Sequence, residues 1–240
     1  MRKISLFQAV CMGLLVSTLF ALTGVSTWAV MHGAGWSDGM LSTLFFLGFW
    51  YVYGMTTHAI LRRHFSFRTG EILPHSKDEF YYHVFHLPFL FFWLYPPAFS
   101  GLIPVPLTRL FYLLFGARIG QNTYPNRCTI FDPQFVEIGD NVILGHQSMI
   151  VPHIIETGRL AHHSIKIGHR VTIGVNAVIL AGVTIGDDAI VAAGSVVPKF
   201  SQIKPGETWA GIPARPLPSK TISSAPVVRG VPEIPTVIDN

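Results

Sequence analysis

The stretch that decides the fold is 167–197, IGHRVTIGVNAVILAGVTIGDDAIVAAGSVV, in which one bulky aliphatic residue recurs every six positions. These residues are Ile167, Ile173, Ile179, Ile185, Val191 and Val197. Six residues turn an α-helix through about 600°, so the six side chains would not form one stripe on a helix. Short strands separated by bends repeat in this way when they stack as coils around a narrow interior. The spacing therefore predicts a β-helix.

The same phase extends upstream, through Ile138, Leu144 and Ile150, and Ile119 indicates an earlier coil. The residue four after each aliphatic is small, as the corner of a thin coil requires; examples are Ala177, Ala189 and Ser195. The repeat breaks only over residues 151–166. An interruption inside so regular an array predicts a loop ejected from the coil, and such loops often carry function.

The N-terminal part of the chain is too apolar for an ordinary soluble domain. Half of the 240 residues are hydrophobic and only 12% are charged. Residues 4–31 and 39–61 contain no Asp, Glu, Lys or Arg, and each run exceeds the ~20 residues that cross a bilayer. Basic residues precede the first run and follow the second, namely Arg2, Lys3, Arg62, Arg63 and Arg68. Residues 1–64 are therefore predicted to form a transmembrane hairpin with both ends in the cytoplasm.

Residues 65–116 form a second membrane-associated region that is rich in aromatic residues and broken by prolines. We expect a re-entrant or interfacial segment at 84–95 and an amphipathic surface helix at 107–115, with a third span left open. The net charge of +4 suits a neighbour of anionic headgroups. The basic residues are scattered, so no nucleic-acid partner is expected. Residues 216–240 are expected to be an extended tail.

The coil resembles the hexapeptide-repeat acyltransferases, the family of the galactoside, maltose and virginiamycin acetyltransferases. The resemblance covers about 119–216 and is carried by Ile167-Gly168 through Val197, then Lys199 and the ending Gly211-Ile212-Pro213-Ala214-Arg215. It implies a mainly β fold, a left-handed parallel β-helix of triangular section over 117–215. It also implies a homotrimer with acetyl-CoA in the groove between neighbouring coils.

Acyl transfer needs a base that deprotonates the acceptor, and histidine is suited to this near neutral pH. Five histidines fall in or beside the interrupted stretch, namely His146, His153, His162, His163 and His169. In the resembling family the catalytic histidine begins the ejected loop, which is the position of His153. Glu156 is the candidate to orient its imidazole. His146, His162 and His163 stay open as residues that assist or replace His153.

The resemblance also implies a cofactor site. By the resemblance, Gly174 and Ala193 match the residues that contact the pantetheine arm and the thioester. Lys199 and Arg215 match the basic residues that contact the coenzyme A phosphates. Two positions depart from the family pattern. Val175 replaces a small polar residue, and Pro198 replaces a common threonine and removes a backbone donor.

The sequence thus predicts an acetyl-CoA-dependent O-acetyltransferase at the inner (cytoplasmic) membrane, with its catalytic domain facing the cytoplasm. The expected acceptor is a saccharide, lipid-linked or polymeric, and the lipid bilayer is a further partner. Three alternatives stay open: N-acetyl transfer to an amino sugar, a non-catalytic glycan-binding β-helix, and a zinc enzyme resembling the γ-class carbonic anhydrases. Val175 and Leu180 stand where those zinc enzymes place histidines, so no metal is expected.

Overall fold

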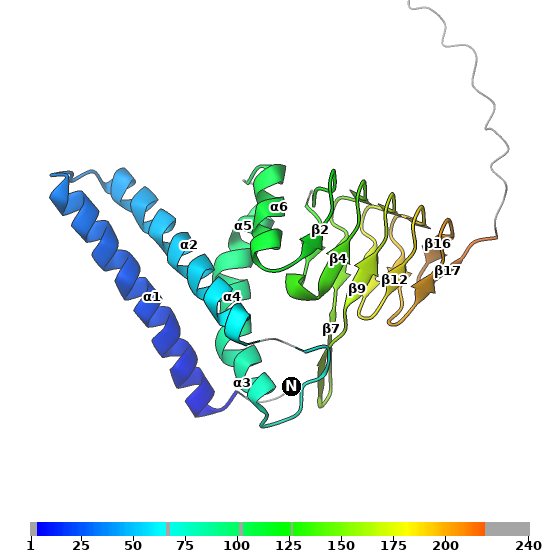
Figure 1. Ribbon diagram of the computed structural model, residues 1–240, viewed down its shortest axis with the longest axis horizontal. Coiled ribbons are helices and arrows are strands. Elements are labelled where there is room, and N and C mark those ends of the chain that lie inside the picture. The colour runs from blue at the N-terminus through cyan, green and yellow to red at the C-terminus, as the bar shows by residue number, and fades with distance from the viewer. Residues whose placement is uncertain (1–3, 66–67, 101–102, 126, 219–240) are drawn as a thin grey trace, which may run out of the picture.

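The chain folds as a layer of helices followed by a stack of parallel β-coils (Figure 1). The computed structural model describes residues 4–65, 68–100, 103–125 and 127–218. The tail expected at 216–240 therefore lies almost wholly outside the described residues.

Three parallel sheets form the sides of the coil, and each takes one short strand from successive turns. The first sheet contains β2 (Arg118–Ile119), β4 (Val136–Ile138), β9 (Ile165–Ile167), β12 (Thr184–Ile185) and β15 (Gln202–Ile203). The second contains β5 (Ile143–Leu144), β10 (Thr172–Ile173), β13 (Ile190–Val191) and β16 (Thr208–Gly211), with β17 (Ala214–Pro216) added antiparallel at the end. The third contains β3 (Thr129–Ile130), β6 (Met149–Val151), β11 (Val178–Leu180) and β14 (Val196–Val197).

The register of these strands confirms the β-helix. Ile167 pairs with Ile185, and Ile179 pairs with Val197, so each residue lies beside the one 18 positions further on. All six aliphatic residues of the repeat are buried in one continuous core. One bulky side chain per strand fills the narrow interior, which explains why the spacing is six. The left hand of the helix and the homotrimer stay predictions.

Two long helices begin the chain, α1 (Leu6–Gly33) and α2 (Gly39–His64). Ser5 caps α1 through a capping box, and the Asp38 side chain accepts a hydrogen bond from Leu41 N at the start of α2. Both helices are long and apolar enough to cross a membrane. A core helix or a signal sequence meets the same criterion, so this is a weak indication of membrane association.

After β1 (Gly70–Glu71), the chain makes an almost unbroken helical run over residues 77–100. The run consists of α3 (Lys77–Tyr81), the π-helical η1 (Tyr82–His86), α4 (Leu87–Phe89), the π-helical η2 (Leu90–Leu94) and α5 (Tyr95–Ser100). Residues 84–95 form part of this run, with Phe91 and Phe92 exposed on one side of it, and their contact with a membrane stays a prediction. Phe89, Trp93 and Leu94 are at most 1% exposed and belong to the same core as the coil. Hydropathy cannot distinguish a side chain that faces lipid from one that faces a protein core.

The helix α6 (Val105–Leu114) closes the layer against the first coil. Its inner face buries Thr108 and Tyr112, while Leu107 and Leu110 are exposed. Arg109 was expected at a membrane surface, but its guanidinium donates to two carbonyl oxygens of the first coil instead. This helix therefore packs on the coil through one side only.

Candidate active site

An antiparallel hairpin leaves the coil where the repeat is interrupted. It consists of β7 (His153–Glu156) and β8 (Arg159–His162), and it confirms that this stretch is ejected from the stack. The linker strand β1 pairs with β8, so the hairpin becomes the centre of a three-stranded sheet. Arg159 Nε lies 2.8 Å from Glu71 Oε1 across the β1–β8 pair. The linker between the helices therefore supports the hairpin that carries His153.

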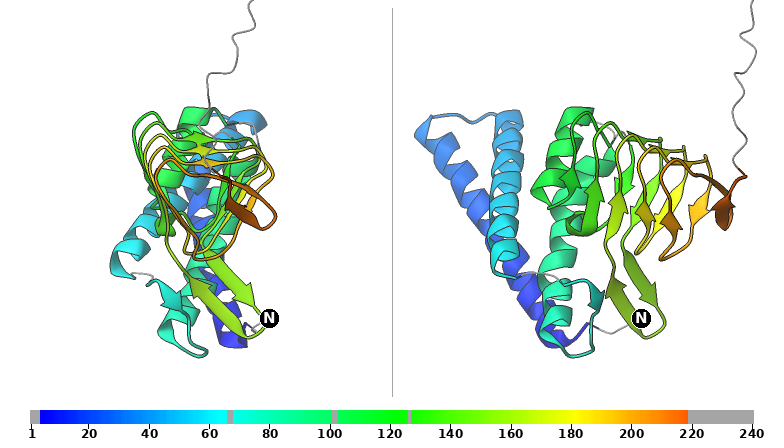
Figure 2. Two further views of the ribbon diagram at one scale, coloured as in Figure 1. Left: turned by 90° about the vertical axis from the view of Figure 1, so that its right-hand side faces the viewer. Right: turned by 45° about the vertical axis from the view of Figure 1, so that its right-hand side comes forward.

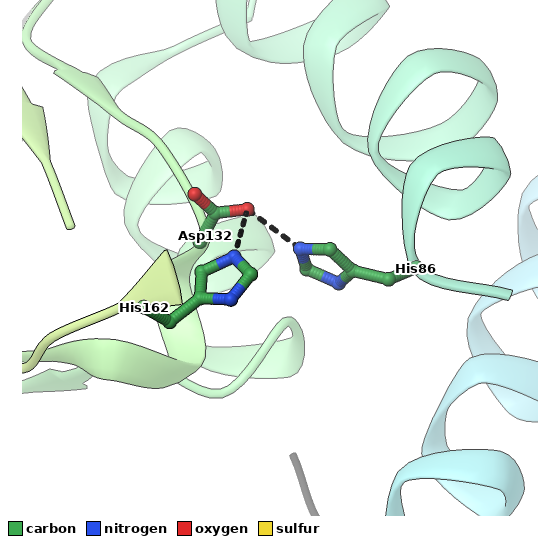
Figure 3. A group of neighbouring side chains, drawn as sticks. All are labelled: His86, Asp132 and His162. Atoms are coloured by element: carbon green, nitrogen blue, oxygen red, sulfur yellow. Dashed lines mark hydrogen bonds and ion pairs between the residues drawn. The ribbon is translucent and has the colours of Figure 1, made fainter. Parts of the chain in front are cut away.

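Asp132 is the centre of the site, and both of its carboxylate oxygens contact histidines. His153 Nδ1 lies 2.6 Å from Oδ2, and His86 Nε2 lies 2.6 Å from Oδ1. His162 Nε2 lies 3.7 Å from Oδ1, beyond hydrogen-bond distance. Figure 3 shows Asp132 between His86, from the helical run, and His162, from the hairpin. The site therefore joins the helices, the first coil and the ejected hairpin.

The backbone of Asp132 is unusual as well. Its φ is +42°, in the left-handed region, and Pro133 follows at the start of a 3₁₀ turn, η3 (Pro133–Phe135). Aspartate tolerates this region better than most residues, but strain of this kind persists mainly where function requires it.

Asp132 is ionised despite its burial. Burial alone would raise the pKa of this carboxyl, but hydrogen bonds from His153 and His86 and the nearness of His162 hold the pKa well below its usual range. An ionised carboxylate can accept hydrogen bonds but cannot donate them, so each imidazole bonded to it must present a ring N–H, which fixes its tautomer. The carboxylate is thus available to stabilise a positive charge on an adjoining imidazole.

The hydrogen-bond network assigns a base-competent tautomer to His153. Its Nδ1–H donates to Asp132, which leaves the lone pair on Nε2 for an acceptor. The Phe131 ring lies 5.6 Å from the imidazole, centroid to centroid, and 23% of the His153 side chain is exposed. On the other side, Gln134 Nε2 lies 3.3 Å from His86 Nδ1, so His86 donates its Nε2–H to Asp132. Of the three histidines around Asp132, His153 alone is open to the outside.

Glu156 does not orient His153. Its carboxylate forms an ion pair with Lys199, and this pair holds the pKa of Glu156 below its usual range. The physical reason is the alternation of side chains along β7: Glu156 is three residues after His153, on the opposite face of the strand. Asp132 occupies the position that sequence reasoning gave to Glu156.

The other candidate histidines have different surroundings. His163 contacts the Phe200 ring, and its backbone donates to Pro152 O. His146 is exposed, and His169 accepts from Asp140 N on the outer surface of the coil. His162 is 1% exposed, and neither ring nitrogen has a hydrogen-bond partner among the described residues. Only His162 therefore lies close enough to assist at Asp132.

Burial lowers the pKa of His162 even though Asp132 lies beside it. The folded protein then binds fewer protons than the unfolded chain once the pH falls below ~6.5, so stability is lost on acidification. We expect His162→Phe, whose ring can stack on Phe135 as the imidazole does, to reduce this loss between pH 6.5 and 5 by at most about 1.4 kcal/mol per pH unit. Thermal midpoints at several pH values measure it, with the exposed His169→Gln as control. Parallel curves for His162→Phe and the unaltered protein would contradict this expectation.

Three of these residues could supply metal ligands. One ligand atom each from His86, Asp132 and His162 lies within 4.8 Å of the others. The distance from His86 Nε2 to Asp132 Oδ1 is 2.6 Å, a hydrogen-bond length. Two ligands that each lie ~2.0–2.1 Å from a tetrahedral zinc ion must be farther apart than this. The geometry therefore favours a hydrogen-bonded cluster over a metal centre.

The four residues expected to bind acetyl-CoA do not meet within one chain. Gly174 and Ala193 lie at the corner between the second and third sheets, and Lys199 lies at the next corner, where the hairpin leaves. Arg215 lies on β17 at the end of the stack. Lys199 is already paired with Glu156. One chain therefore does not bring the four residues to a single corner of the coil.

The glycine at 174 has a structural reason of its own. A Cβ there would come within 2.3 Å of Ala193 N in the next coil, where backbone atoms cannot move aside. We expect Gly174→Ala to lower the free energy of unfolding by about 1–3 kcal/mol, as overpacking does. Thermal unfolding of the detergent-solubilised chain measures it. The control is Gly48→Ala in α2, where a Cβ meets nothing within 4 Å; equal midpoints for the two variants would contradict the steric explanation.

Sequence reasoning missed Asp132 and His86. A signal for Asp132 was present, because it stands six residues before Ile138, where the repeat calls for an aliphatic residue. The 3₁₀ turn after Asp132 adds residues to this coil, so Ile130 fills the interior and Asp132 faces the hairpin. His86 had no such signal, since it lies among aromatic residues of the helical run.

The comparisons find that part of the coil is similar to known hexapeptide-repeat proteins. Residues 164–199 match the family model described as the hexapeptide repeat of succinyl-transferase. A putative acetyltransferase of Schizosaccharomyces pombe is 32% identical over 111 residues, which are 43% of this chain and 53% of that protein. Gamma carbonic anhydrase 1 of Arabidopsis thaliana is 34% identical over 78 residues, 32% of this chain and 24% of that protein.

The delta-poly-L-ornithine synthetase of Acinetobacter baumannii is 27% identical over 120 residues, which are 50% of this chain and 9% of that enzyme. The chain thus spans between a tenth and about half of the curated relatives it matches. Among solved structures, a galactoside acetyltransferase in complex with coenzyme A is similar to this chain, with a TM-score of 0.42 and 28% sequence identity. The match covers 52% of this chain and 76% of the galactoside acetyltransferase chain.

Proposed function

We propose that the protein is a membrane-associated acyltransferase that uses acetyl-CoA to O-acetylate a saccharide. The observation that carries this proposal is the pair His153–Asp132, in which a buried carboxylate holds one ring nitrogen and the other is open to an acceptor. A base oriented by a carboxylate is what deprotonation of a hydroxyl requires. The choice of an acetyl group is supported by the similarity over 111 residues to the Schizosaccharomyces pombe protein named as a putative acetyltransferase.

The reaction needs no covalent acyl-enzyme. His153 Nε2 takes the proton of the acceptor hydroxyl while the hydroxyl oxygen bonds to the carbonyl carbon of the thioester. The carbon–sulfur bond then breaks, and the His153 imidazolium returns the proton to the departing sulfur. Asp132 stabilises the imidazolium between these two steps. The products are the acetylated saccharide and free coenzyme A.

Acetyl-CoA supplies the activated acetyl group, and Gly174, Ala193, Lys199 and Arg215 would hold it. Lys199 and Arg215 carry the charge that suits the phosphates of coenzyme A. Because these residues lie at different corners of one chain, the proposal includes a homotrimer whose grooves lie between copies. A phosphate at Lys199 would compete with Glu156 for the ammonium group.

The acceptor is proposed to be a lipid-linked or polymeric saccharide at the cytoplasmic side of the inner membrane. Two apolar N-terminal helices support this choice, since a soluble acceptor would not need them. An acceptor hydroxyl suits an imidazole base, because a hydroxyl is a weak nucleophile until its proton is removed, whereas the free amine of an amino sugar is already nucleophilic.

The test is transfer of labelled acetyl groups from acetyl-CoA to glycolipid and polysaccharide fractions by the purified full chain, with mass spectrometry of the glycans. We expect a gain of acetyl groups with the unaltered protein and none with His153→Ala. Transfer to amines alone would favour the N-acetyl alternative. Elemental analysis of the active protein separates the zinc alternative, because activity that follows stoichiometric zinc and is lost on chelation would refute a metal-free mechanism.

A further inference from the structure

The helix α2 packs along the helical run over 77–100 and the end of α6, which together with α2 are called the helical layer. Trp93 of the helical run donates its Nε1–H to Trp50 O at 2.8 Å, and the two indole rings stack at 4.5 Å. A Cβ at Gly54 would come within 1.8 Å of Trp93, so a glycine there allows this close approach. Further along α2, His58 stacks on Phe115, which follows α6, at 4.4 Å. These contacts fix the direction of α2 relative to the layer.

The helical layer is in turn fastened to the first coil. Arg109 of α6 donates to Ile119 O and Gly120 O, each at 3.0 Å. The Tyr112 hydroxyl donates to Cys128 O at 3.1 Å from the buried side of the same helix. The layer and the coil therefore cannot tilt independently.

Figures 1 and 2 show that the coils stack away from this layer, while α2, the helical run and α6 lie across the stacking direction. The first two coils already carry exposed charges. Arg118 and Glu137 form an ion pair whose side chains are 79% and 40% exposed, and Asp140 is exposed to 42%. If α2 crossed a bilayer along its normal, the coil beside it would lie at the same depth. Burying these charges in hydrocarbon is costly, so the crossing orientation is unfavourable.

If α2 instead lies parallel to the membrane surface, the apolar helices are immersed in lipid and the charged coils are in water. The helix α1 is apolar on all sides, which is typical of immersion rather than of a water-facing helix. Its exposed large side chains are Leu6, Phe7, Val10, Leu14, Phe20, Leu22, Val25 and Trp28. Three exposed arginines lie at and after the end of α2, where their charges can pair with anionic headgroups: Arg62, Arg63 and Arg68. In this orientation all coils lie outside the hydrocarbon layer.

We infer that the hairpin of α1 and α2 is immersed in one leaflet of an anionic phospholipid membrane, with α2 parallel to the membrane surface, and that the coil projects from that surface into the cytoplasm. The hairpin of helices then anchors the protein without crossing the bilayer. The partner is the lipid leaflet itself, which covers the outer side of the helical layer.

This orientation places the active site beside the headgroups, a consequence that rests on the proposed function. His86 belongs to the helical layer and contacts Asp132 of the first coil, so the base His153, which bonds to the same carboxylate, lies beside the coil nearest the membrane. Gly174, Ala193 and Arg215 belong to coils further from the layer. The acceptor hydroxyl would therefore reach His153 from the membrane surface, and acetyl-CoA would enter from water.

The test is labelling of single cysteines with a maleimide that does not cross membranes. In the Cys11→Ser/Cys128→Ser background, one variant carries Ser37→Cys in the link between α1 and α2, and a second carries Asp187→Cys on the coil. We expect neither variant to react in intact spheroplasts. The Asp187→Cys variant should react in inverted membrane vesicles, and the Ser37→Cys variant should react when detergent is added.

Reaction of the Ser37→Cys variant in intact spheroplasts would overturn the inference, because the link would then lie on the far side of the membrane. Recovery of the chain in the soluble fraction, with no binding to phosphatidylglycerol-containing vesicles, would also overturn it, since another protein surface would then cover α1 and α2. Labelling does not depend on acyl transfer, so the same pattern is expected after His153→Ala. A wrong orientation and a wrong reaction therefore give different results.

Discussion

Replacing His153 with alanine is expected to lower kcat for acetyl transfer by about 10²- to 10⁴-fold, the usual contribution of a general base. The imidazole is the one group at the hairpin that combines an oriented nitrogen with access from outside. KM for acetyl-CoA should change little, because His153 is not among the residues proposed to hold the coenzyme. Steady-state kinetics with an isolated glycan acceptor measures both constants.

The matched control for this variant is His169→Ala, which removes an exposed histidine from the outer surface of the coil. It should retain full activity. If His153→Ala kept more than about a tenth of kcat while folding normally, general-base catalysis by this residue would be refuted. His162 would then be the next residue to test, since it is the other hairpin histidine near Asp132.

Replacing Asp132 with asparagine is expected to lower kcat by a similar factor, about 10²- to 10⁴-fold. The side chain keeps its shape, but its amide can donate to His153 Nδ1 and so favour the tautomer that carries its proton on Nε2. That tautomer cannot accept a proton from the acceptor hydroxyl. The variant also loses the negative charge that stabilises the imidazolium.

The matched control for Asp132→Asn is Glu156→Gln, the same chemical change at the other candidate carboxylate. It breaks only an exposed ion pair with Lys199, so kcat should be close to that of the unaltered protein. The double variant Asp132→Asn/His153→Ala should be no worse than His153→Ala alone, because the two residues act as a unit. Additive losses would contradict a shared role. Binding of coenzyme A by calorimetry shows whether each variant still folds.

The prediction of Glu156 as the orienting carboxylate illustrates what a local pattern can miss. It was chosen because it is near His153 in sequence, but alternation along β7 turns its side chain away. The true partner, Asp132, is 21 residues earlier and reaches His153 because the first and second coils stack. The helical run over 77–100 gives a second example, since hydropathy did not show that Phe89 and Trp93 pack on the end of the coil while Phe91 and Phe92 stay exposed.

The sequence by itself determined the coil, its phase and the ejection of the hairpin with His153 at its base. A repeat of one aliphatic residue in six is a local constraint, which each strand satisfies with its own residues and its nearest neighbours. Only the tertiary structure decided the partners of His153 and the direction of α2. Those depend on contacts between segments far apart in the chain, such as His86 with Asp132 and Trp50 with Trp93, and no periodicity in the sequence records such contacts.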